Sequence, residues 1–392
     1  MSEVTPHPNL VQNYARFPLR FVRGAGCWLY DEDGRAYLDC LSGIAVNALG
    51  HGHPHLTAAI REQAGQLLHT SNLFGIAPQE RLAERLCAAS FADRVYFCNS
   101  GAEANETAFK IARLWGNQVH GGSKPRIVAA EASFHGRTVG ALAMTGTAAY
   151  REPFAPLPAV DFVPYGDVGA LEQAMRPDVS ALVLEPLQGE GGVRVPPAGY
   201  LQQARALCDQ HQALLIFDEV QTGIGRTGDL FAYQHEGVVP DVMSLAKGLG
   251  GGVPIGASLM REELAQLLTP GTHASTFGGN HLACAAGNAV LDVVQGDGFL
   301  PGVRTAGARI AAELQRLLGD AAVEVRGRGL LIGAQLRSAP LPLLRACLDQ
   351  GLICGVAGSN VLRLAPPLII GEAEIDALVE RLAAAWTACP IA

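Results

Sequence analysis

Short apolar runs recur through the central part of the chain, each followed by polar or glycine-rich residues and often by a helix-length segment. Apolar residues are consecutive within these runs, which is typical of strands buried on both faces of a parallel sheet. We expect strands at Arg94–Cys98, Arg126–Ala130, Val160–Val163, Ala181–Leu184, Leu214–Phe217, Val242–Leu245 and Ile255–Met260. Helix-length segments lie at Ala102–Leu114, Gly166–Met175 and Gly199–His211. This alternation predicts an α/β fold with a large, mostly parallel seven-stranded sheet.

The two ends of the chain show a different pattern. Trp28–Tyr30 and Ala36–Asp39 are joined by Asp31–Arg35, a turn signal that favours a small antiparallel hairpin. After residue 300, helix and strand patterns follow one another at Ala306–Leu318, Val323–Arg326, Leu330–Leu336, Leu341–Gln350, Val361–Leu364 and Ala373–Cys389. These flanking elements predict a smaller α+β unit.

The 392 residues, 49% of them hydrophobic, are enough for two or three domains. We expect residues 71–295 to form the large domain. Residues 1–70 and 296–392 would be the N-terminal and C-terminal parts of one smaller, discontinuous domain.

Charge and cysteine content limit the possible partners. The net charge of −8 is spread without blocks, so neither a nucleic acid nor a membrane surface is expected as a partner. The nine cysteines show no metal-binding spacing, which favours free thiols and no metal. The segment Met1–Arg20 has no apolar signal region, and no apolar run is long enough to cross a bilayer. We therefore expect a cytoplasmic protein.

The most informative residue is Lys247, which follows an apolar run and precedes the glycine cluster Gly248–Gly252. Asp218 ends the preceding run, and a buried carboxylate is costly unless its charge is met. A protonated pyridine nitrogen would meet it, and a lysine in apolar surroundings could hold an aldehyde cofactor as a Schiff base. A lysine on a solvated loop is the alternative, but Asp218 and a phosphate site accompany this one.

Ligands of open parallel sheets bind beyond the carboxyl ends of the strands. Ser100, Gly101 and Ala102 open a helix there and would form a phosphate site, although an ordinary capped helix is the alternative. Phe134 could stack on a flat ring, and Arg137 could bind a carboxylate. The alternative for these two is a core residue and a surface ion pair.

Three further polar residues follow the strand ends. Glu190 lies among glycines and could pair with a positive group when the site is empty. Gln221, three residues after Asp218, could reach the phenolic oxygen of a pyridine ring. Glu185 has no assigned role beyond a structural one.

Together these residues make the chain similar to the class III (ω-amino acid) aminotransferases, which are pyridoxal-phosphate enzymes of fold type I. The similarity runs from Gly43–His51 to Arg363–Leu368. Within the class the chain most resembles the acetylornithine aminotransferases, and four segments carry this likeness: Asn99–Glu106, Phe134–Thr138, Glu185–Val193 and Ser275–Asn280.

The resemblance implies a role for each residue of the cofactor site. Lys247 would bind pyridoxal 5'-phosphate covalently and later carry the proton, while Asp218 would bind the pyridine nitrogen and Gln221 the phenolic oxygen. Phe134 and Val220 would cover the two ring faces.

The resemblance also implies how the phosphate is bound. Ser100, Gly101 and Ala102 would hold it, and Thr276 would reach the phosphate of the partner subunit's cofactor. The active unit would then be a homodimer with an active site shared across the interface.

Two arginines would bind substrate carboxylates. Arg137, with Ser275 near it, would bind the α-carboxylate of acetylornithine, and Arg363 that of 2-oxoglutarate or glutamate. Glu190 would pair with Arg363 while the amino donor reacts and leave it for the acceptor.

The implied activity transfers the δ-amino group of N2-acetyl-L-ornithine to 2-oxoglutarate, giving N-acetylglutamate semialdehyde and glutamate in arginine biosynthesis. The alternative is a broader ω-transaminase acting on ornithine, 4-aminobutyrate, succinylornithine or simple amines. Gly75 favours a broader range of amino donors. Many relatives carry a larger residue in that segment, and a glycine there would leave a larger substrate pocket. An aminomutase or racemase, or a non-catalytic cofactor-binding protein, are further alternatives.

Overall fold

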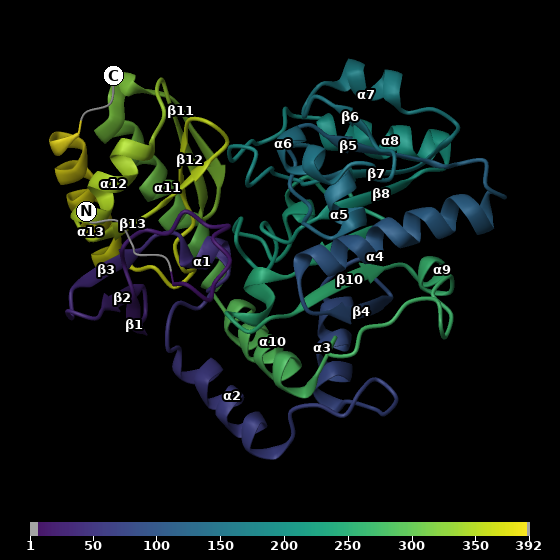
Figure 1. The fold of residues 1–392 in the computed structure, drawn as a ribbon, viewed down its shortest axis with the longest axis horizontal. Helices are drawn as coiled ribbons and strands as arrows, with labels where there is room; N and C mark the ends of the chain where they lie inside the picture. Colours follow the sequence, from purple (N-terminus) through teal and green to yellow (C-terminus); the bar gives the residue numbers. More distant parts are fainter. Residues whose placement is uncertain (1–6, 390–392) are drawn as a thin grey trace.

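The structure, a computed structural model, describes residues 7–389. Residues 1–6 of the segment Met1–Arg20 and residues 390–392 of the predicted C-terminal range lie outside the described residues. Figure 1 shows a large sheet with its helices on one side of the molecule and elements from both ends of the chain on the other.

The large sheet has the strand order β4-β10-β9-β8-β7-β5-β6. Its strands are β4 (Arg94–Cys98), β5 (Arg126–Ala130), β6 (Asp161–Val163), β7 (Val179–Leu184), β8 (Leu214–Asp218), β9 (Val242–Leu245) and β10 (Gly256–Met260). The apolar runs predict all of them, with ends that differ by at most two residues. Strand β10 alone is antiparallel to its neighbours, because the connection 246–255 is too short for a crossover helix.

Both faces of this sheet are buried. Successive side chains of a strand point to opposite faces. Leu182 and Leu184 of β7 accordingly belong to one apolar cluster, whereas Ala181 and Val183 belong to another. Helices α7 (Val168–Ala174) and α8 (Tyr200–His211) contribute to the first cluster, and α4 (Gly101–Leu114) and α5 (Val139–Met144) contribute to the second. This two-sided burial explains why the runs are continuously apolar.

Elements from both ends of the chain share a sheet. Strands β1 (Phe21–Ala25), β2 (Trp28–Asp31) and β3 (Ala36–Asp39) are antiparallel, and β13 (Leu352–Ile353) pairs in parallel with β3. The pairing joins the N-terminal hairpin to the C-terminal segment. The domain boundaries at residues 70 and 295 stay a prediction.

A second small sheet has the order β11-β12-β15-β14. Its strands are β11 (Ala322–Arg328), β12 (Leu331–Leu336), β14 (Gly355–Ala357) and β15 (Val361–Leu364). Helix α11 (Phe299–Leu318) packs against β11 and β12, and α12 (Leu341–Asp349) packs against β14. Helix α13 (Glu372–Ala388) packs against both of these helices and against β3 and β13.

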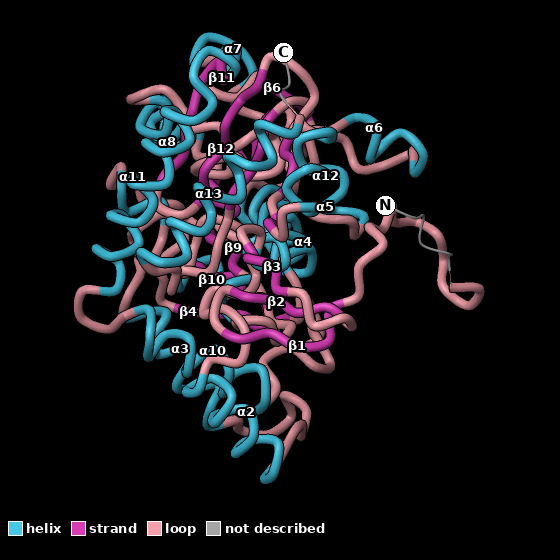
Figure 2. The backbone as a smooth tube through the Cα atoms, turned by 90° about the vertical axis from the view of Figure 1, so that its left-hand side faces the viewer, coloured by secondary structure: helices cyan, strands magenta, loops and turns pink. Residues whose placement is uncertain are grey.

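Three of the longer helices, each with at least 12 residues, were not predicted. Helices α2 (Pro54–Gln66), α3 (Ala77–Ala88) and α10 (His281–Val294) pack together at one end of the molecule (Figure 2). Helix α2 buries only Leu56, and α10 is buried around most of its surface. Neither therefore shows the one-sided apolar period from which a helix is predicted.

The remaining helical segments are short: α1 (Ser42–Ala45), α6 (Ala148–Arg151), α9 (Glu262–Ala265), a π-helix at Trp115–Val119 and single 3₁₀ turns. Within residues 7–389, no helix combines the length and apolar character needed to span a membrane.

Two glycines of α11 give a matched test of the packing. A methyl group added at Gly307 would meet the backbone carbonyl of Gly329, whereas one added at Gly302 would meet open space. Alanine normally stabilises a helix relative to glycine by about 0.5–1 kcal/mol. We expect Gly302→Ala to raise the free energy of unfolding by this amount and Gly307→Ala to lower it by roughly 1–3 kcal/mol. Urea denaturation measures both, and a stabilised Gly307→Ala would contradict the close packing of α11 against Gly329, which directly follows β11.

Candidate active site

The carboxyl ends of the parallel strands border a cavity of about 380 Å³. The residues predicted from the sequence that line it are Ser100, Gly101, Ala102, Phe134, Arg137, Glu190, Asp218, Val220, Gln221 and Lys247. Arg363 is connected to the cavity through an ion pair with Glu190. Ser275 and Thr276 are not among the lining residues.

Asp218 is the last residue of β8, and only 3% of its surface is exposed. Its Oδ2 accepts a hydrogen bond from Asn105 Nδ2 and is hydrogen-bonded to His135 Nδ1, both at 2.7 Å. Its Oδ1 accepts a hydrogen bond at 2.9 Å from the backbone N–H of Val220. These contacts hold the buried carboxylate in one orientation at the cavity wall.

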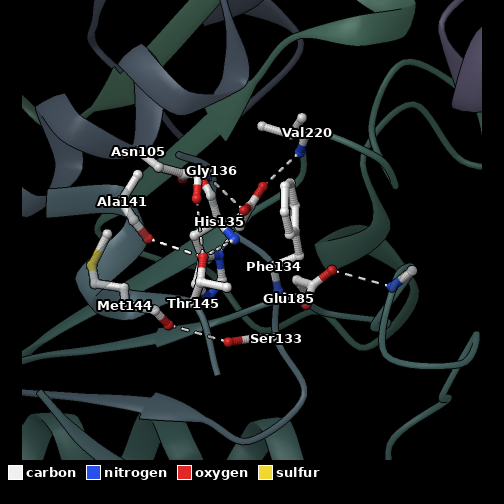
Figure 3. Close-up of polar contacts among 12 residues, drawn as sticks. Asn105, Ser133, Phe134, His135, Gly136, Ala141, Met144, Thr145, Glu185 and Val220 are labelled. Atoms are coloured by element: carbon white, nitrogen blue, oxygen red, sulfur yellow. Dashed lines mark hydrogen bonds and ion pairs between the residues drawn. The ribbon is translucent and has the colours of Figure 1, made fainter. Parts of the chain in front are cut away.

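His135 stabilises the negative charge of Asp218. Burial alone would lower the pKa of the imidazole, but the hydrogen bond and negative charge of Asp218 raise it above the ordinary value. The backbone N–H of His135 donates to Thr145 Oγ1 at 3.0 Å, and that hydroxyl contacts the carbonyl groups of Gly136 and Ala141 (Figure 3). The loop after β5 is therefore fixed around the histidine.

Lys247 begins a 3₁₀ turn two residues after the last residue of β9 and has a φ of 43°. This left-handed conformation is unusual for a residue with a side chain and is characteristic of functional sites. Burial lowers the pKa of the ammonium group, against the opposing charge of Glu190 and with the help of Arg363. A larger share of the lysine is therefore the uncharged, nucleophilic amine.

The N-terminus of α4 forms another wall. Ser100 caps it, because its Oγ accepts a hydrogen bond from the Glu103 N–H at 3.2 Å. Gly101 and Ala102 are the first helical residues, whose N–H groups have no partner within the helix. A Cβ on Gly101 would lie 2.6 Å from Val220 Cγ1, so only glycine fits. The arrangement favours an anion.

Aromatic side chains surround Arg137. Its guanidinium carbon lies 3.9 Å from the centre of the Tyr150 ring and 5.5 Å from that of Phe134. Tyr150 lies on the short helix α6, and no sequence motif predicts its contact with Arg137. Cation–π contacts of this kind orient the exposed guanidinium at the cavity.

Glu190 and Arg363 form an ion pair with an Oε1–NH1 distance of 2.5 Å. Gln221 lies within 3.4 Å of both side chains, so it bridges them. Burial would raise the pKa of Glu190, but the positive charges of Arg363 and Lys247 lower it overall. Arg363 is only 4% exposed, and Glu190 keeps its charge balanced.

The segment around Ser275 lies next to the cavity rather than in it. Ser275 Oγ accepts hydrogen bonds from Asn99 Nδ2 at 3.2 Å and from the Gly278 N–H at 3.0 Å. Thr276 is exposed. Gly75 is also exposed and does not line the cavity, so it does not enlarge the pocket within one chain.

Sequence reasoning missed three members of the site. It assigned no role to Asn105 or His135, and it gave Glu185 only a structural one. Glu185 accepts hydrogen bonds from the N–H groups of Gly189 at 3.1 Å and Phe134 at 3.4 Å, and burial raises its pKa to about 7. The available signal was position, because Glu185 directly follows β7 and Asn105 is a polar residue on the buried face of α4.

The Aminotransferase class-III family matches residues 10–386 of the chain. The chain belongs to the class-III aminotransferases. It is 49% identical over 386 residues to the acetylornithine aminotransferase of Agrobacterium fabrum, with 97% of each chain covered. It is also 49% identical over 378 residues to the acetylornithine aminotransferase of Caldanaerobacter subterraneus, and this match covers 95% of this chain and 96% of the relative.

Solved structures agree with this membership. This class-III aminotransferase matches the ornithine aminotransferase of Toxoplasma gondii with a TM-score of 0.93 and 36% identity, and the match covers 97% of this chain and 93% of that one. It matches the N-acetylornithine aminotransferase of Stenotrophomonas maltophilia with a TM-score of 0.84, 40% identity and coverage of 95% and 96%. The prediction of a fold type I aminotransferase is confirmed.

The raised pKa of Glu185 gives this aminotransferase a pH-dependent stability. Between pH 4.5 and about 7 the unfolded chain ionises this carboxyl while the folded chain keeps it protonated, so the free energy of unfolding falls as pH rises. Glu185→Gln removes this loss and keeps an acceptor for Gly189. We expect the variant to gain roughly 2–3 kcal/mol relative to wild type between pH 5 and pH 8 in urea denaturation. A difference that is independent of pH would contradict the buried, protonated state.

Proposed function

We propose that this aminotransferase moves the δ-amino group of N2-acetyl-L-ornithine to 2-oxoglutarate, giving N-acetylglutamate semialdehyde and glutamate in arginine biosynthesis. The observation that carries the proposal is the Glu190–Arg363 ion pair beside Lys247. Such a pair lets one cavity accept an amine-bearing side chain and then a carboxylate. The relatives named acetylornithine aminotransferase support the choice of donor.

The residues of the cavity fit pyridoxal 5'-phosphate. Asp218 supplies a buried carboxylate for a protonated ring nitrogen, and the helix start at Ser100–Ala102 supplies amide groups for a phosphate. The missing side chain of Gly101 leaves a space that a Cβ would fill. Phe134 and Val220 would cover the ring, and Gln221 would lie near its phenolic oxygen.

Each residue would then have a defined task. When bound, the cofactor supplies an aldehyde that takes up the amino group and a ring that accepts the electron pair released at the substrate carbon. Lys247 Nζ would accept a proton from the carbon that bears the amine, which its lowered pKa permits. Asp218, supported by His135 and Asn105, would keep the ring nitrogen protonated.

Each of the two arginines would bind the carboxylate of a different substrate. Arg137 would bind the α-carboxylate of acetylornithine, with Ser275 nearby. Glu190 would neutralise Arg363 while the donor is bound, and rotation of Glu190 away would free Arg363 for the carboxylate of 2-oxoglutarate. Donor and acceptor would therefore use the site in turn, with ping-pong kinetics.

The active unit we propose is a homodimer. Leu73, Phe74 and Phe277 are 87%, 68% and 59% exposed and lie in two segments joined by the hydrogen bond of Asn72 to the Gly278 carbonyl at 2.9 Å. Such a patch is typical of an interface, and it borders Thr276, which would then reach the partner's phosphate site. Sedimentation should give the mass of two chains, and a monomeric active enzyme would contradict this arrangement.

A panel of amino donors with 2-oxoglutarate tests the function. We expect the highest kcat/KM with N2-acetylornithine, and lower values with ornithine, 4-aminobutyrate, succinylornithine and simple amines. Arg137→Ala should lower kcat/KM for acetylornithine by about tenfold or more, because a charged hydrogen-bonding partner is lost, and should change that for simple amines little. Lys247→Ala controls for activity from another site.

Two results would contradict the proposal. Equal or higher kcat/KM for ornithine or simple amines would favour the broader ω-transaminase. Turnover of the donor without any keto acid would favour an aminomutase or racemase.

A further inference from the structure

One row of residues crosses the second small sheet. Arg326 of β11 and Arg363 of β15 both lie directly opposite Gly333 of β12. Residues directly opposite each other on neighbouring strands share a face of the sheet. The two arginines therefore point to the same side, with a residue that has no side chain between them.

The loop that carries Glu190 packs into the gap at Gly333. A Cβ on Gly333 would lie 2.8 Å from Val193 Cβ, so Val193 occupies the space that a side chain would need. Val193 is fully buried in an apolar cluster that includes Leu331 and Val361. Its φ of 49° is a strained value for a β-branched residue, which the surrounding structure must impose.

Arg326 holds the backbone of this strained loop. Its Nε donates to the Val193 carbonyl at 3.0 Å, and its NH2 donates to the Gly192 carbonyl at 2.7 Å. Its NH1 donates to Gln335 Oε1 at 2.5 Å and Glu324 Oε2 at 2.7 Å. The guanidinium is thus fixed by its own sheet on one edge and bound to the loop by the other.

The same sheet also binds the loop at Glu190 itself. The N–H of Gly358, between β14 and β15, donates to the Glu190 carbonyl at 2.8 Å, and Arg363 binds the Glu190 carboxylate. The backbone at Glu190 and on its C-terminal side is therefore anchored to the sheet that carries Arg363, so rotation of the Glu190 side chain is the simplest way to break the ion pair.

We propose that Arg326 is a positioning residue for substrate selection: by fixing the loop at Gly192 and Val193, it keeps Glu190 opposite Arg363. This proposal rests on the alternating use of Arg363 proposed above. Without Arg326, Glu190 would neutralise Arg363 less well. A donor ammonium would then face an uncompensated guanidinium, while a dicarboxylate would find Arg363 more accessible.

The test measures the two substrates separately on the holoenzyme. In Arg326→Met we expect the second-order rate constant of the single-turnover reaction with N2-acetylornithine to fall about tenfold or more. The corresponding rate constant with glutamate should change less than about threefold. Glutarate is a dicarboxylate probe that does not react. Calorimetry should show that it binds to Arg326→Met at least as tightly as to the wild-type protein. Arg328→Met is the control, because Arg328 lies on the same strand but pairs with Glu236.

Two further variants separate positioning from folding. Gly333→Ala would displace Val193 while leaving both arginines, and it should reproduce the loss for acetylornithine. In a Glu190→Gln background, Arg326→Met should have little additional effect, because Arg326 acts through Glu190.

The proposal is overturned if Arg326→Met lowers the rate constants for acetylornithine and glutamate and the affinity for glutarate by similar factors. It is also overturned if the effect of Arg326→Met is the same in the Glu190→Gln background. Failure of the proposed function looks different, because the wild-type protein would then prefer another amino donor to acetylornithine or turn over the donor without a keto acid.

Discussion

The buried carboxylate of Asp218 is the constraint on which the site depends. It ends a fully buried strand, so its charge must be met inside the protein, and Asn105, His135 and the Val220 amide do this. Asn105 fixes α4 relative to β8, and His135 fixes the loop that carries Phe134. Since Asp218 pairs with Ser244 of β9, Lys247 follows three residues later at the same sheet edge. One carboxylate therefore aligns cavity-lining residues from four parts of the chain.

The second small sheet contributes the other half of the site. The large sheet supplies rigid strand ends, whereas Arg363 comes from β15 and balances Glu190 from the loop after β7. Charge in the cavity is thus shared between elements far apart in the sequence. Glu185, with a pKa raised to about 7, adds a carboxyl that burial favours in its protonated form. In the proposed reaction the Glu190–Arg363 ion pair would open while the remaining polar contacts of the site stay fixed.

The strands could be predicted because burial on both faces forces continuous apolar runs. The site followed from them, since polar residues after parallel strands meet at one edge. The partners of Asp218 could not be predicted in the same way, because the contacts of Asn105 and His135 depend on how α4 and the β5 loop pack. The role of Arg326 could not be predicted either, because it binds carbonyl groups of a loop more than 130 residues earlier. Every residue has a backbone carbonyl group, so the sequence does not indicate which of them accept a hydrogen bond from an arginine.

The most direct test is the rate of the donor reaction in Asp218→Asn. Asparagine keeps the shape of the side chain but carries no charge to hold a proton on the ring nitrogen. The variant should fold and bind pyridoxal phosphate, while the single-turnover rate with N2-acetylornithine falls by about a thousandfold. A folded, cofactor-loaded Asp218→Asn protein that reacts within roughly tenfold of the wild-type rate would contradict the role of Asp218.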